Sequence, residues 1–434
     1  MHAVEKVDVV IIGAGPSGSS AAALLRQRGY AVCIIEKQHF PRFSIGESLL
    51  PQSMVFLEEA GLLDTVRAHV DEYAFQFKNG AAFLRGKQRS HYDFTAKFSE
   101  GPGTTWQVRR ANFDHLLAQQ AAAYGADIRF GHEVTAVDVE PQHPLLTVQN
   151  EAGERYQIEA GFLLDASGFG RILPKLLDLE SPSDFPVRRA VFTHIEDGIL
   201  DDPTFDRQKI LITVHEKDHR AWYWLIPFAD GRSSFGIVAE QDFFDHYQFD
   251  RNEPEALQAL FGRILADEPA LSQVLRNKKF DTPLRTLVGY SANVTQLAGR
   301  NFALLGNAGE FLDPVFSSGV TIALKSSSLA VPLVDQVLRG EQVDWQSQYE
   351  KPLRKGIKVF RAYVEAWYEG EFQDVVFSTQ QNDKIRRMIA SLLAGYAWDD
   401  RNPIHKNARQ RLSTLADYCR EGRNMEGLSQ AEVN

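Results

Sequence analysis

The sequence "VDVVIIGAGPSG", residues 7–18, decides the fold of this chain. Residues 7–12 form a short apolar run typical of a buried parallel strand, and the helical segment "SSAAALLRQRGY" follows the glycines. Gly13, Gly15 and Gly18 match G-x-G-x-x-G. In that motif the first glycine permits a tight turn, the second lets a pyrophosphate approach the backbone, and the third lets helix and strand pack closely. The stretch predicts a Rossmann-like dinucleotide-binding unit in an α/β protein; a glycine turn in some other α/β protein is the alternative.

The next apolar segment indicates which dinucleotide is bound. "AVCIIE", residues 31–36, ends in Glu36, about 20 residues after the glycines. A carboxylate there accepts from ribose hydroxyls and disfavours a 2′-phosphate, which favours FAD or NAD over NADP. "GFLLDASGFG" (161–170) and "NFALLGNAGEFLDPVFSSGV" (301–320) suit a long cofactor lying across a discontinuous domain, so we expect FAD. Since no second G-x-G-x-x-G is present, we expect a transient donor or a separate flavin reductase to supply reducing equivalents.

The composition limits the class of protein. The 434 residues are 44% hydrophobic and 24% charged, with a net charge of −10. These values predict a soluble globular protein of two or three domains and argue against broad affinity for nucleic acid, although a local basic patch stays compatible with them. There is no apolar run of the roughly 18 to 20 residues that a membrane span needs, and too little chain precedes the first strand for a signal peptide, so we expect a cytoplasmic protein. Cys33 and Cys419 have no disulfide or metal-ligand spacing.

The remaining pattern predicts further strands and helices. Residues 112–124 read as a helix, 133–164 as a β meander or hairpin set, and 185–240 as an antiparallel sheet rich in β-branched and aromatic residues. After about residue 345 the pattern becomes helical. We therefore expect a discontinuous FAD-binding domain at 1–70, 100–180 and 285–342, a substrate domain at 71–99 and 181–284, and a helical C-terminal region at 343–434.

Several stretches together carry a family resemblance. They are the glycine fingerprint, "FPRFSIGESLLP" (40–51), "VRRANFD" (108–114), "DASG" (165–168), "WYWLIP" (222–227) and "GNAGEFLDPVFSSGV" (306–320). With them the chain resembles the FAD-dependent monooxygenase superfamily, and within it the flavin-dependent halogenases of phenol and pyrrole type and their geranylgeranyl-reductase-like relatives. The resemblance implies a glutathione-reductase-type FAD-binding domain with an antiparallel-sheet substrate domain and a helical C-terminal region.

The resemblance also implies which residues meet the cofactor. In halogenases the segment after Glu36 is a strap near the isoalloxazine, and Arg110 would contact the cofactor. Asn307 stands where most of the superfamily has aspartate; asparagine can still bond a ribityl hydroxyl, but the lost charge could alter flavin potential or affinity. The expected cofactor-binding residues are Gly13, Gly15, Pro16, Ser17, Gly18, Glu36, Lys37, Arg42, Ile45, Gly46, Glu47, Ser48, Arg110, Asp165, Ala166, Gly168, Asn307, Asp313 and Pro314.

Two further sites follow from the resemblance. The family's halide sits against backbone N–H groups of a Ser/Thr-Gly pair, here Ser318 and Gly319; a flavin-binding loop at a helix N-terminus is the alternative. The expected substrate pocket contains Trp222, Trp224, Pro227 and Phe316. The tandem tryptophans either hold substrate away from the flavin or only pack the sheet against the flavin domain. Phe316 replaces the glutamate of tryptophan-type halogenases, which argues against indole halogenation with that proton acceptor.

Lys78 is the candidate catalytic residue. It lies in "FQFKNGAAF" (75–83), a position that resembles the lysine motif of phenol- and pyrrole-type halogenases. In that family reduced FAD and O2 oxidise halide to hypohalous acid, which a lysine hydrogen-bonds or carries as a haloamine beside the organic substrate. A long, flexible, donor-only head group suits this task. Because most lysines are surface charges, a solvated Lys78 is the alternative.

The function expected from this resemblance is halogenation of an aromatic or polyene-type substrate, free or tethered to an acyl carrier. Basic side chains of the C-terminal region could receive an acidic carrier protein or could simply solvate helices; they are Lys351, Arg354, Lys355, Lys384, Arg386 and Arg387. Two alternatives stay open. One is an FAD-dependent reductase, dehydrogenase or monooxygenase acting on an unsaturated substrate, and the other is a non-catalytic flavoprotein subunit of a biosynthetic assembly. We expect no metal site.

Overall fold

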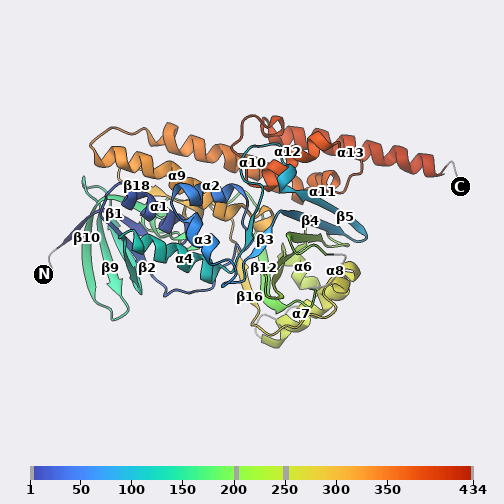
Figure 1. The fold of residues 1–434 in the computed structure, drawn as a ribbon, viewed down its shortest axis with the longest axis horizontal. Helices are drawn as coiled ribbons and strands as arrows, with labels where there is room; N and C mark the ends of the chain where they lie inside the picture. The colour runs from blue at the N-terminus through green and yellow to red at the C-terminus, as the bar shows by residue number, and fades with distance from the viewer. Residues whose placement is uncertain (1–3, 200–204, 248–253, 432–434) are drawn as a thin grey trace.

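Two sheets form the two lobes of the molecule, and the C-terminal helices run along both (Figure 1). The computed structural model describes residues 4–199, 205–247 and 254–431. Among these residues no helix is long and apolar enough to cross a membrane. The observed architecture is the α/β fold with a helical C-terminal region that the sequence predicts.

The first lobe is built around a mainly parallel sheet. Its central strand is the fingerprint strand β1 (Glu5–Ile12), whose residues Val9 to Ile11 are completely buried. Strand β1 lies parallel between β2 (Val32–Glu36) and β10 (Arg155–Asp165), which ends at the aspartate of "DASG". The remaining strands are β7 (Asp127–Phe130) beside β2, β18 (Phe302–Leu304) parallel to the end of β10, and the antiparallel β9 (Leu145–Asn150) and β8 (His132–Asp138).

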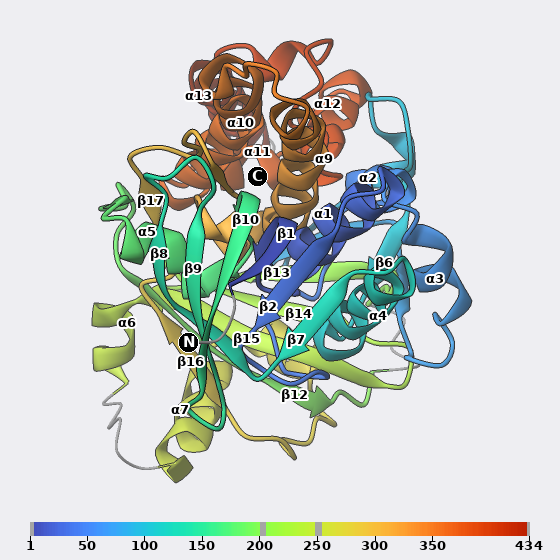
Figure 2. The ribbon, with the colours of Figure 1, turned by 90° about the vertical axis from the view of Figure 1, so that its left-hand side faces the viewer.

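Three helices pack over this sheet (Figure 2). Helix α1 (Pro16–Gln27) follows the glycine loop and packs against α4 (Arg110–Ala123) and α9 (Ser318–Leu338). Helix α4 begins two residues before the predicted start at residue 112. Smaller helices complete the lobe: α2 (Gln52–Glu59), α3 (Leu63–Ala68) and α5 (Ile172–Leu176).

The second lobe is a sheet whose two faces serve different cores. Strand β14 (Trp222–Pro227) shows the alternation: Trp222 and Trp224 join the core shared with the first lobe, whereas Tyr223 and Leu225 join a separate apolar cluster. Helices α6 (Gln241–His246), α7 (Pro254–Ala266) and α8 (Pro269–Val274) belong to this second lobe. The strand order is β16 (Arg285–Val288), β12 (Arg188–Glu196), β15 (Arg232–Glu240), β14, β13 (Lys209–Val214), β4 (Gly80–Arg85) and β5 (Gln88–Asp93). Neighbouring strands are antiparallel except β13 and β4, which are parallel.

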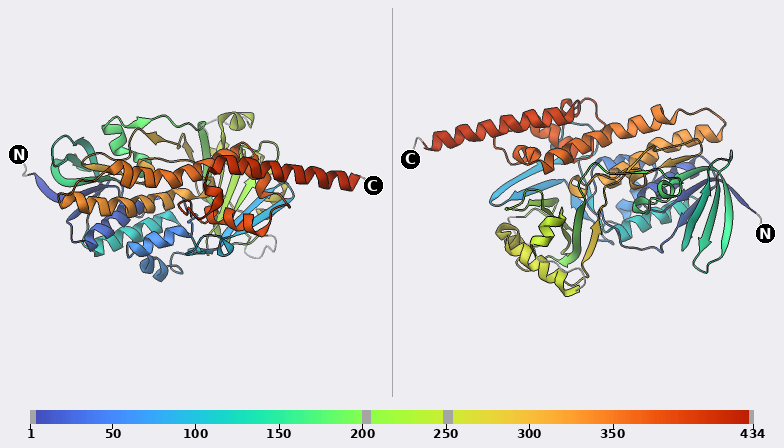
Figure 3. Two further views of the ribbon diagram at one scale, coloured as in Figure 1. Left: turned by 90° about the horizontal axis from the view of Figure 1, so that it is seen from above. Right: turned by 180° about the vertical axis from the view of Figure 1, so that it is seen from behind.

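The C-terminal region is helical, as predicted. Its helices are α10 (Lys351–Tyr368), α11 (Glu371–Val376), α12 (Asp383–Leu393) and α13 (Ala408–Ala431). Helix α10 packs against α9 of the first lobe, and α13 extends past the body of the molecule (Figure 3). Two short ribbons join distant segments: β3 (Gln76–Lys78) with β6 (Thr105–Gln107), and β11 (Glu180–Ser181) with β17 (Asn293–Val294).

The strand pairing suggests one change to the domain division. Strand β16 (Arg285–Val288) pairs with β12 in the second sheet, although the sequence-based division places residues 285–342 in the FAD-binding domain. We therefore propose that this boundary lies after Val288.

Candidate active site

The glycine loop brings β1 and α1 into close contact. Gly13 has φ +97°, and a Cβ there would lie 2.6 Å from the carbonyl oxygen of Ala166. A Cβ on Gly18 would lie 1.9 Å from the carbonyl oxygen of Gly13. Only glycine fits at either position. The loop thereby presents the first N–H groups of α1, which have no partner within the helix, and leaves room for an anion.

A cavity of about 310 Å³ runs from this loop to the tryptophans of β14. Most of the predicted site residues line it: Gly13, Gly15, Pro16, Ser17, Glu36, Arg42, Ile45, Gly46, Glu47, Ser48, Arg110, Ala166, Gly168, Trp222, Trp224, Asn307, Pro314 and Gly319. The structure places other predicted residues outside its lining: Gly18, Lys37, Lys78, Asp165, Pro227, Asp313, Phe316 and Ser318. The additional lining includes the aromatic or apolar residues Phe43, Phe169, Leu287, Tyr290 and Phe311.

Two predicted cofactor residues instead have their polar groups engaged elsewhere. The carboxylate of Asp165 is fully buried, and its two oxygens accept backbone N–H bonds from Ser167 at 2.8 Å and Leu173 at 2.7 Å. The Asp165 carboxylate therefore stabilises the backbone of the "DASG" turn. Lys37 is exposed and pairs with Glu133 at 2.8 Å.

Glu36 stands at the end of β2 with its carboxylate against the glycine loop. Its Oε2 accepts from the N–H of Ala14 and its Oε1 from the N–H of Gln38, both at 2.9 Å. These bonds fix the carboxylate at the cavity wall. Each carboxylate oxygen retains a further lone pair for a ribose hydroxyl.

Two guanidinium groups share one buried carboxylate on the cavity wall. Asp114 Oδ2 accepts from Arg42 Nη1 at 2.9 Å and from Arg110 Nη2 at 2.9 Å, and its Oδ1 accepts from Arg110 Nε at 2.7 Å. Asp114 is completely buried. The cluster carries one net positive charge, which suits a pyrophosphate. Together with the glycine loop and Glu36, these residues fit an adenine dinucleotide such as FAD.

The strap, residues 42–50, is held along its length. Arg110 Nη1 donates to Ile45 O at 2.6 Å, and Val108 N donates to Glu47 O at 2.7 Å. The side chain of Glu47, only 2% exposed, meets His194 Nε2 at 2.6 Å. His194 comes from β12, and the sequence alone does not identify it, because nothing in its local sequence distinguishes it from other strand residues. The strap thus places one carboxylate in the cavity with an imidazole behind it.

Lys78 is buried, which excludes the solvated alternative. Its Nζ donates to Ser48 Oγ and to Leu49 O, both at 2.7 Å, and no part of the residue is exposed. It lines a second, very small cavity with Phe316, Ser317 and Ile210, and the last two also line the large cavity. Lys78 therefore lies one layer of side chains behind the main cavity. In the ammonium form, one of its three donors remains for a ligand.

Burial lowers the pKa of Lys78 to about 7. Between pH 7 and the usual lysine value near 10.5, the unfolded chain is protonated at this residue while the folded chain is neutral, so raising the pH stabilises the fold. We expect Lys78→Met to remove this dependence: relative to the variant, the wild type should gain about 2 kcal/mol between pH 7.5 and 9.5. Urea unfolding at both pH values measures this. Lys6→Met is the control, because it removes a lysine charge from a side chain that is 72% exposed.

The predicted halide loop leads into the N-terminus of α9. Asp313 Oδ1 accepts from Val315 N at 3.0 Å and fixes the turn Pro314–Phe316. Ser317 follows with φ +55°, a left-handed conformation that is strained for a non-glycine residue. Helix α9 then begins at Ser318, and its first N–H groups lack helical partners at the cavity edge beside Gly319 and Val320. The arrangement offers backbone donors to an anion.

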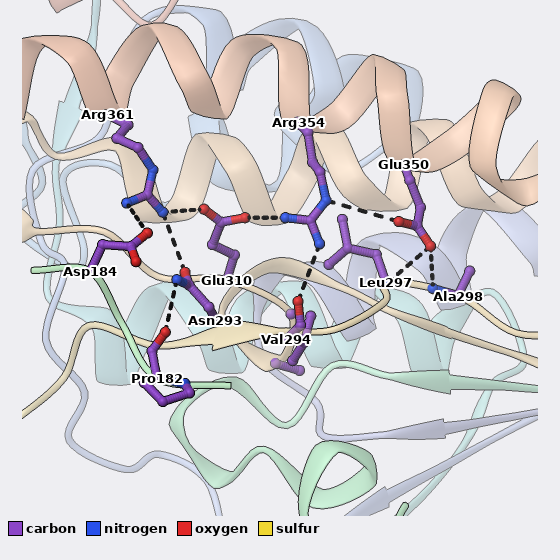
Figure 4. Close-up of polar contacts among 12 residues, drawn as sticks. Pro182, Asp184, Asn293, Val294, Leu297, Ala298, Glu310, Glu350, Arg354 and Arg361 are labelled. Carbon is purple, nitrogen blue, oxygen red and sulfur yellow. Dashed lines mark hydrogen bonds and ion pairs between the residues drawn. The ribbon is translucent and has the colours of Figure 1, made fainter. Parts of the chain in front are cut away.

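An ion-pair network holds α10 against the loop after β18 (Figure 4). The buried carboxylate of Glu310 accepts from Arg354 at 2.9 Å and from Arg361 at 2.7 Å. Other basic residues predicted as a carrier surface are also engaged: Lys355 pairs with Asp400, and Arg386 and Arg387 donate to backbone carbonyls of His91 and Ala96. In the described part of the chain, no cluster of three or more His, Cys, Asp or Glu side chains could hold a metal ion.

Comparisons with known proteins agree with this geometry. The FAD binding domain family matches residues 6–305. The chain is 30% identical over 440 residues to the flavin-dependent halogenase armH3 of Armillaria mellea, covering 95% of this chain and 84% of that protein. It is also 30% identical to the sulochrin halogenase gedL of Aspergillus terreus, covering 80% of this chain but 66% of gedL, just under two thirds of its length. A solved structure described as a flavoprotein/dehydrogenase from Cytophaga hutchinsonii is 41% identical with a TM-score of 0.90, covering 96% of this chain and 100% of that one.

Proposed function

The chain belongs to the FAD binding domain family and, within it, to the flavin-dependent halogenases. From that premise we propose that it halogenates an aromatic or polyene-type substrate with halide, O2 and reduced FAD. One observation carries the proposal: the buried Lys78 and Ser317 of the predicted halide loop line the same small cavity, directly behind the FAD cavity. A lysine that only anchored the strap would not need to face the halide loop.

The residues divide the binding task along the cavity. The glycine loop and the Arg42–Asp114–Arg110 cluster would hold the pyrophosphate, and Glu36 would hold a ribose. The first N–H groups of α9 would hold the halide. The aromatic walls, with Trp222 and Trp224, suit a flat apolar substrate.

The overall reaction consumes a proton. FAD, when bound in its reduced form, supplies the electrons with which O2 oxidises halide to hypohalous acid. With RH as substrate the balance is RH + X⁻ + H⁺ + O2 + FADH2 → RX + FAD + 2 H2O. Glu47 lies in the cavity, and His194 behind it is partly exposed, with its side chain 19% accessible. Because His194 Nε2 lies 2.6 Å from the Glu47 carboxylate, this pair would pass the proton from solvent to the cavity.

Lys78 would deliver the oxidised halogen. With a pKa of about 7, it is present as both ammonium and amine at neutral pH. The ammonium would polarise hypohalous acid by a hydrogen bond, or the amine would take up the halogen and release water. Either form passes X⁺ to the substrate carbon, whose proton is lost.

An aerobic assay tests the proposal. The FAD-loaded protein, a flavin reductase with NADH, bromide and an electron-rich phenol should give a brominated product by mass spectrometry. Catalase and omission of bromide are the controls. An unhalogenated phenol under conditions where bound FAD is reduced and reoxidised would count against a halogenase.

A second candidate is an FAD-dependent dehydrogenase. The 41% identity to the protein described as a flavoprotein/dehydrogenase favours it. A dehydrogenase would turn over without O2 or halide, so anaerobic reoxidation of bound FADH2 by an unsaturated substrate would favour this candidate. The acyl-carrier tether, the separate reductase and a cytoplasmic location stay predictions.

A further inference from the structure

A chain of buried hydrogen bonds connects the substrate wall to the halide loop through the C-terminal helix α10. Trp222 Nε1 donates to Tyr368 Oη at 2.8 Å, and the Tyr368 hydroxyl donates to Asp313 Oδ2 at 2.9 Å. Trp222 is 1% exposed, Tyr368 8% and Asp313 1%. The three residues come from the second sheet, the last residue of α10 and the first lobe.

The order of donors in this chain is fixed by chemistry. An indole N–H can only donate and a carboxylate can only accept, so the hydroxyl between them must accept from Trp222 and donate to Asp313. Asp313 uses its other oxygen to cap the turn that precedes Ser317 and Ser318. The Tyr368 hydroxyl therefore links Trp222 of the substrate pocket to Asp313, which fixes the turn before the halide loop.

A buried cation supports the same hydroxyphenyl ring. The guanidinium of Arg188 lies 3.4 Å from the ring centroid of Tyr368, and its Nη1 lies 3.6 Å from Asp313 Oδ2. Tyr290, a wall of the cavity, also reaches Asp313 Oδ2 at 3.4 Å. Burial raises the pKa of Asp313, and the charge of Arg188 acts against that rise. The ring of Tyr368 is thus fixed by stacking, and its hydroxyl by two hydrogen bonds.

We propose that Tyr368 is a positioning residue, which sets the orientation of Trp222 and the conformation of the halide loop together. The catalytic consequence rests on the proposed function; the structural consequence does not. Without the hydroxyl, Trp222 Nε1 and Asp313 Oδ2 would each lose a buried partner, and neither the indole nor the turn at 313–317 would keep one geometry.

Tyr368→Phe tests the structural consequence, and Tyr363→Phe is its matched control. Tyr363 lies on the same helix and is completely buried, but its hydroxyl has no hydrogen-bond partner among the described residues. In protein labelled with ¹⁵N-tryptophan, the indole signal of Trp222, assigned with Trp222→Phe, should move in Tyr368→Phe and stay in Tyr363→Phe. Amide exchange of residues 313–320 should become about five-fold faster in Tyr368→Phe alone, as expected for one net hydrogen bond.

Two results would overturn the proposal: an unmoved Trp222 signal with unchanged exchange, or equal changes in both variants. Should Tyr368→Phe fail to fold, Asp313→Asn provides another test. Within the described residues Asp313 reaches Trp222 through Tyr368, so its substitution should still move the Trp222 signal, and a fixed signal would contradict the coupling.

The catalytic consequence is measured separately. Tyr368→Phe should raise the KM for bromide about five-fold with the Kd for FAD unchanged, and Tyr363→Phe should match the wild type. If the wild type makes no halogenated product, the proposed function fails while the spectroscopic result still decides the role of Tyr368. If the wild type halogenates and Tyr368→Phe does so with an unchanged KM for bromide, the positioning role is overturned.

Discussion

Lys78→Ala should reduce halogenated product by about 100- to 1,000-fold, the usual effect of removing one preorganised donor, while O2 still reoxidises the bound FAD. The loss follows from the position of Lys78, which lines the small cavity together with Ser317. With no lysine to hold it, hypohalous acid would escape to solvent or decay. The measurement is product by mass spectrometry beside NADH and O2 consumption.

Lys97→Ala is the matched control for this prediction. Lys97 is also a buried lysine, 8% exposed, and burial also lowers its pKa, but its Nζ donates to Gly101 O and it lines neither cavity. Lys78 also anchors Ser48 and Leu49 of the strap, so FAD content must be compared between Lys78→Ala and Lys78→Met. Equal product from Lys78→Ala and the wild type would contradict the catalytic role.

Gly18→Ala should abolish FAD binding. The new Cβ would lie 1.9 Å from Gly13 O, a backbone atom that cannot rotate away, so α1 must separate from the loop. We expect a loss of stability of about 3 kcal/mol or more and at least a 100-fold weaker FAD affinity, because the amides of α1 would no longer face the pyrophosphate. Flavin absorbance after gel filtration and the Tm of the apo-protein measure the two effects.

Gly262→Ala is the control for the glycine loop. Gly262 is also a helical glycine, in α7, but a Cβ there meets no atom within 4 Å, so alanine should be neutral or stabilising. A yellow, stable Gly18→Ala protein would mean that the loop does not hold the cofactor as described.

The glycine loop was readable from sequence because local spacing alone imposes its geometry. The second sheet was readable from β-branched and aromatic runs, and the helical C-terminal region from its periodicity. Lys78 was different: its burial depends on Ser48 and Leu49, about 30 residues away, and on a strap whose path no local pattern reveals. The basic residues Arg354 and Lys355 suggested a docking surface, but their acidic partners Glu310 and Asp400 are far along the chain.

His194 and Tyr368 are residues whose roles could not be predicted from motif spacing in the sequence. His194 meets Glu47 across 147 residues, and Tyr368 meets Trp222 across 146. Neither lies in a motif, and each acquires its role from tertiary contact alone. Asp165 is the reverse case, since it lies in a motif but its oxygens are both taken by the backbone that it shapes.

Helix α10 is attached to both lobes, and this attachment limits how substrate and product can enter and leave the cavity. Its middle is fixed to Glu310 in the first lobe, and its end is fixed to Trp222 in the second. Opening a hinge between the lobes would break the contacts of α10 with one of them, either its ion pairs to Glu310 or the hydrogen bond between Tyr368 and Trp222. We therefore expect exchange of substrate and product to depend on local rotation of rim side chains such as Phe169, with the lobes moving as one body.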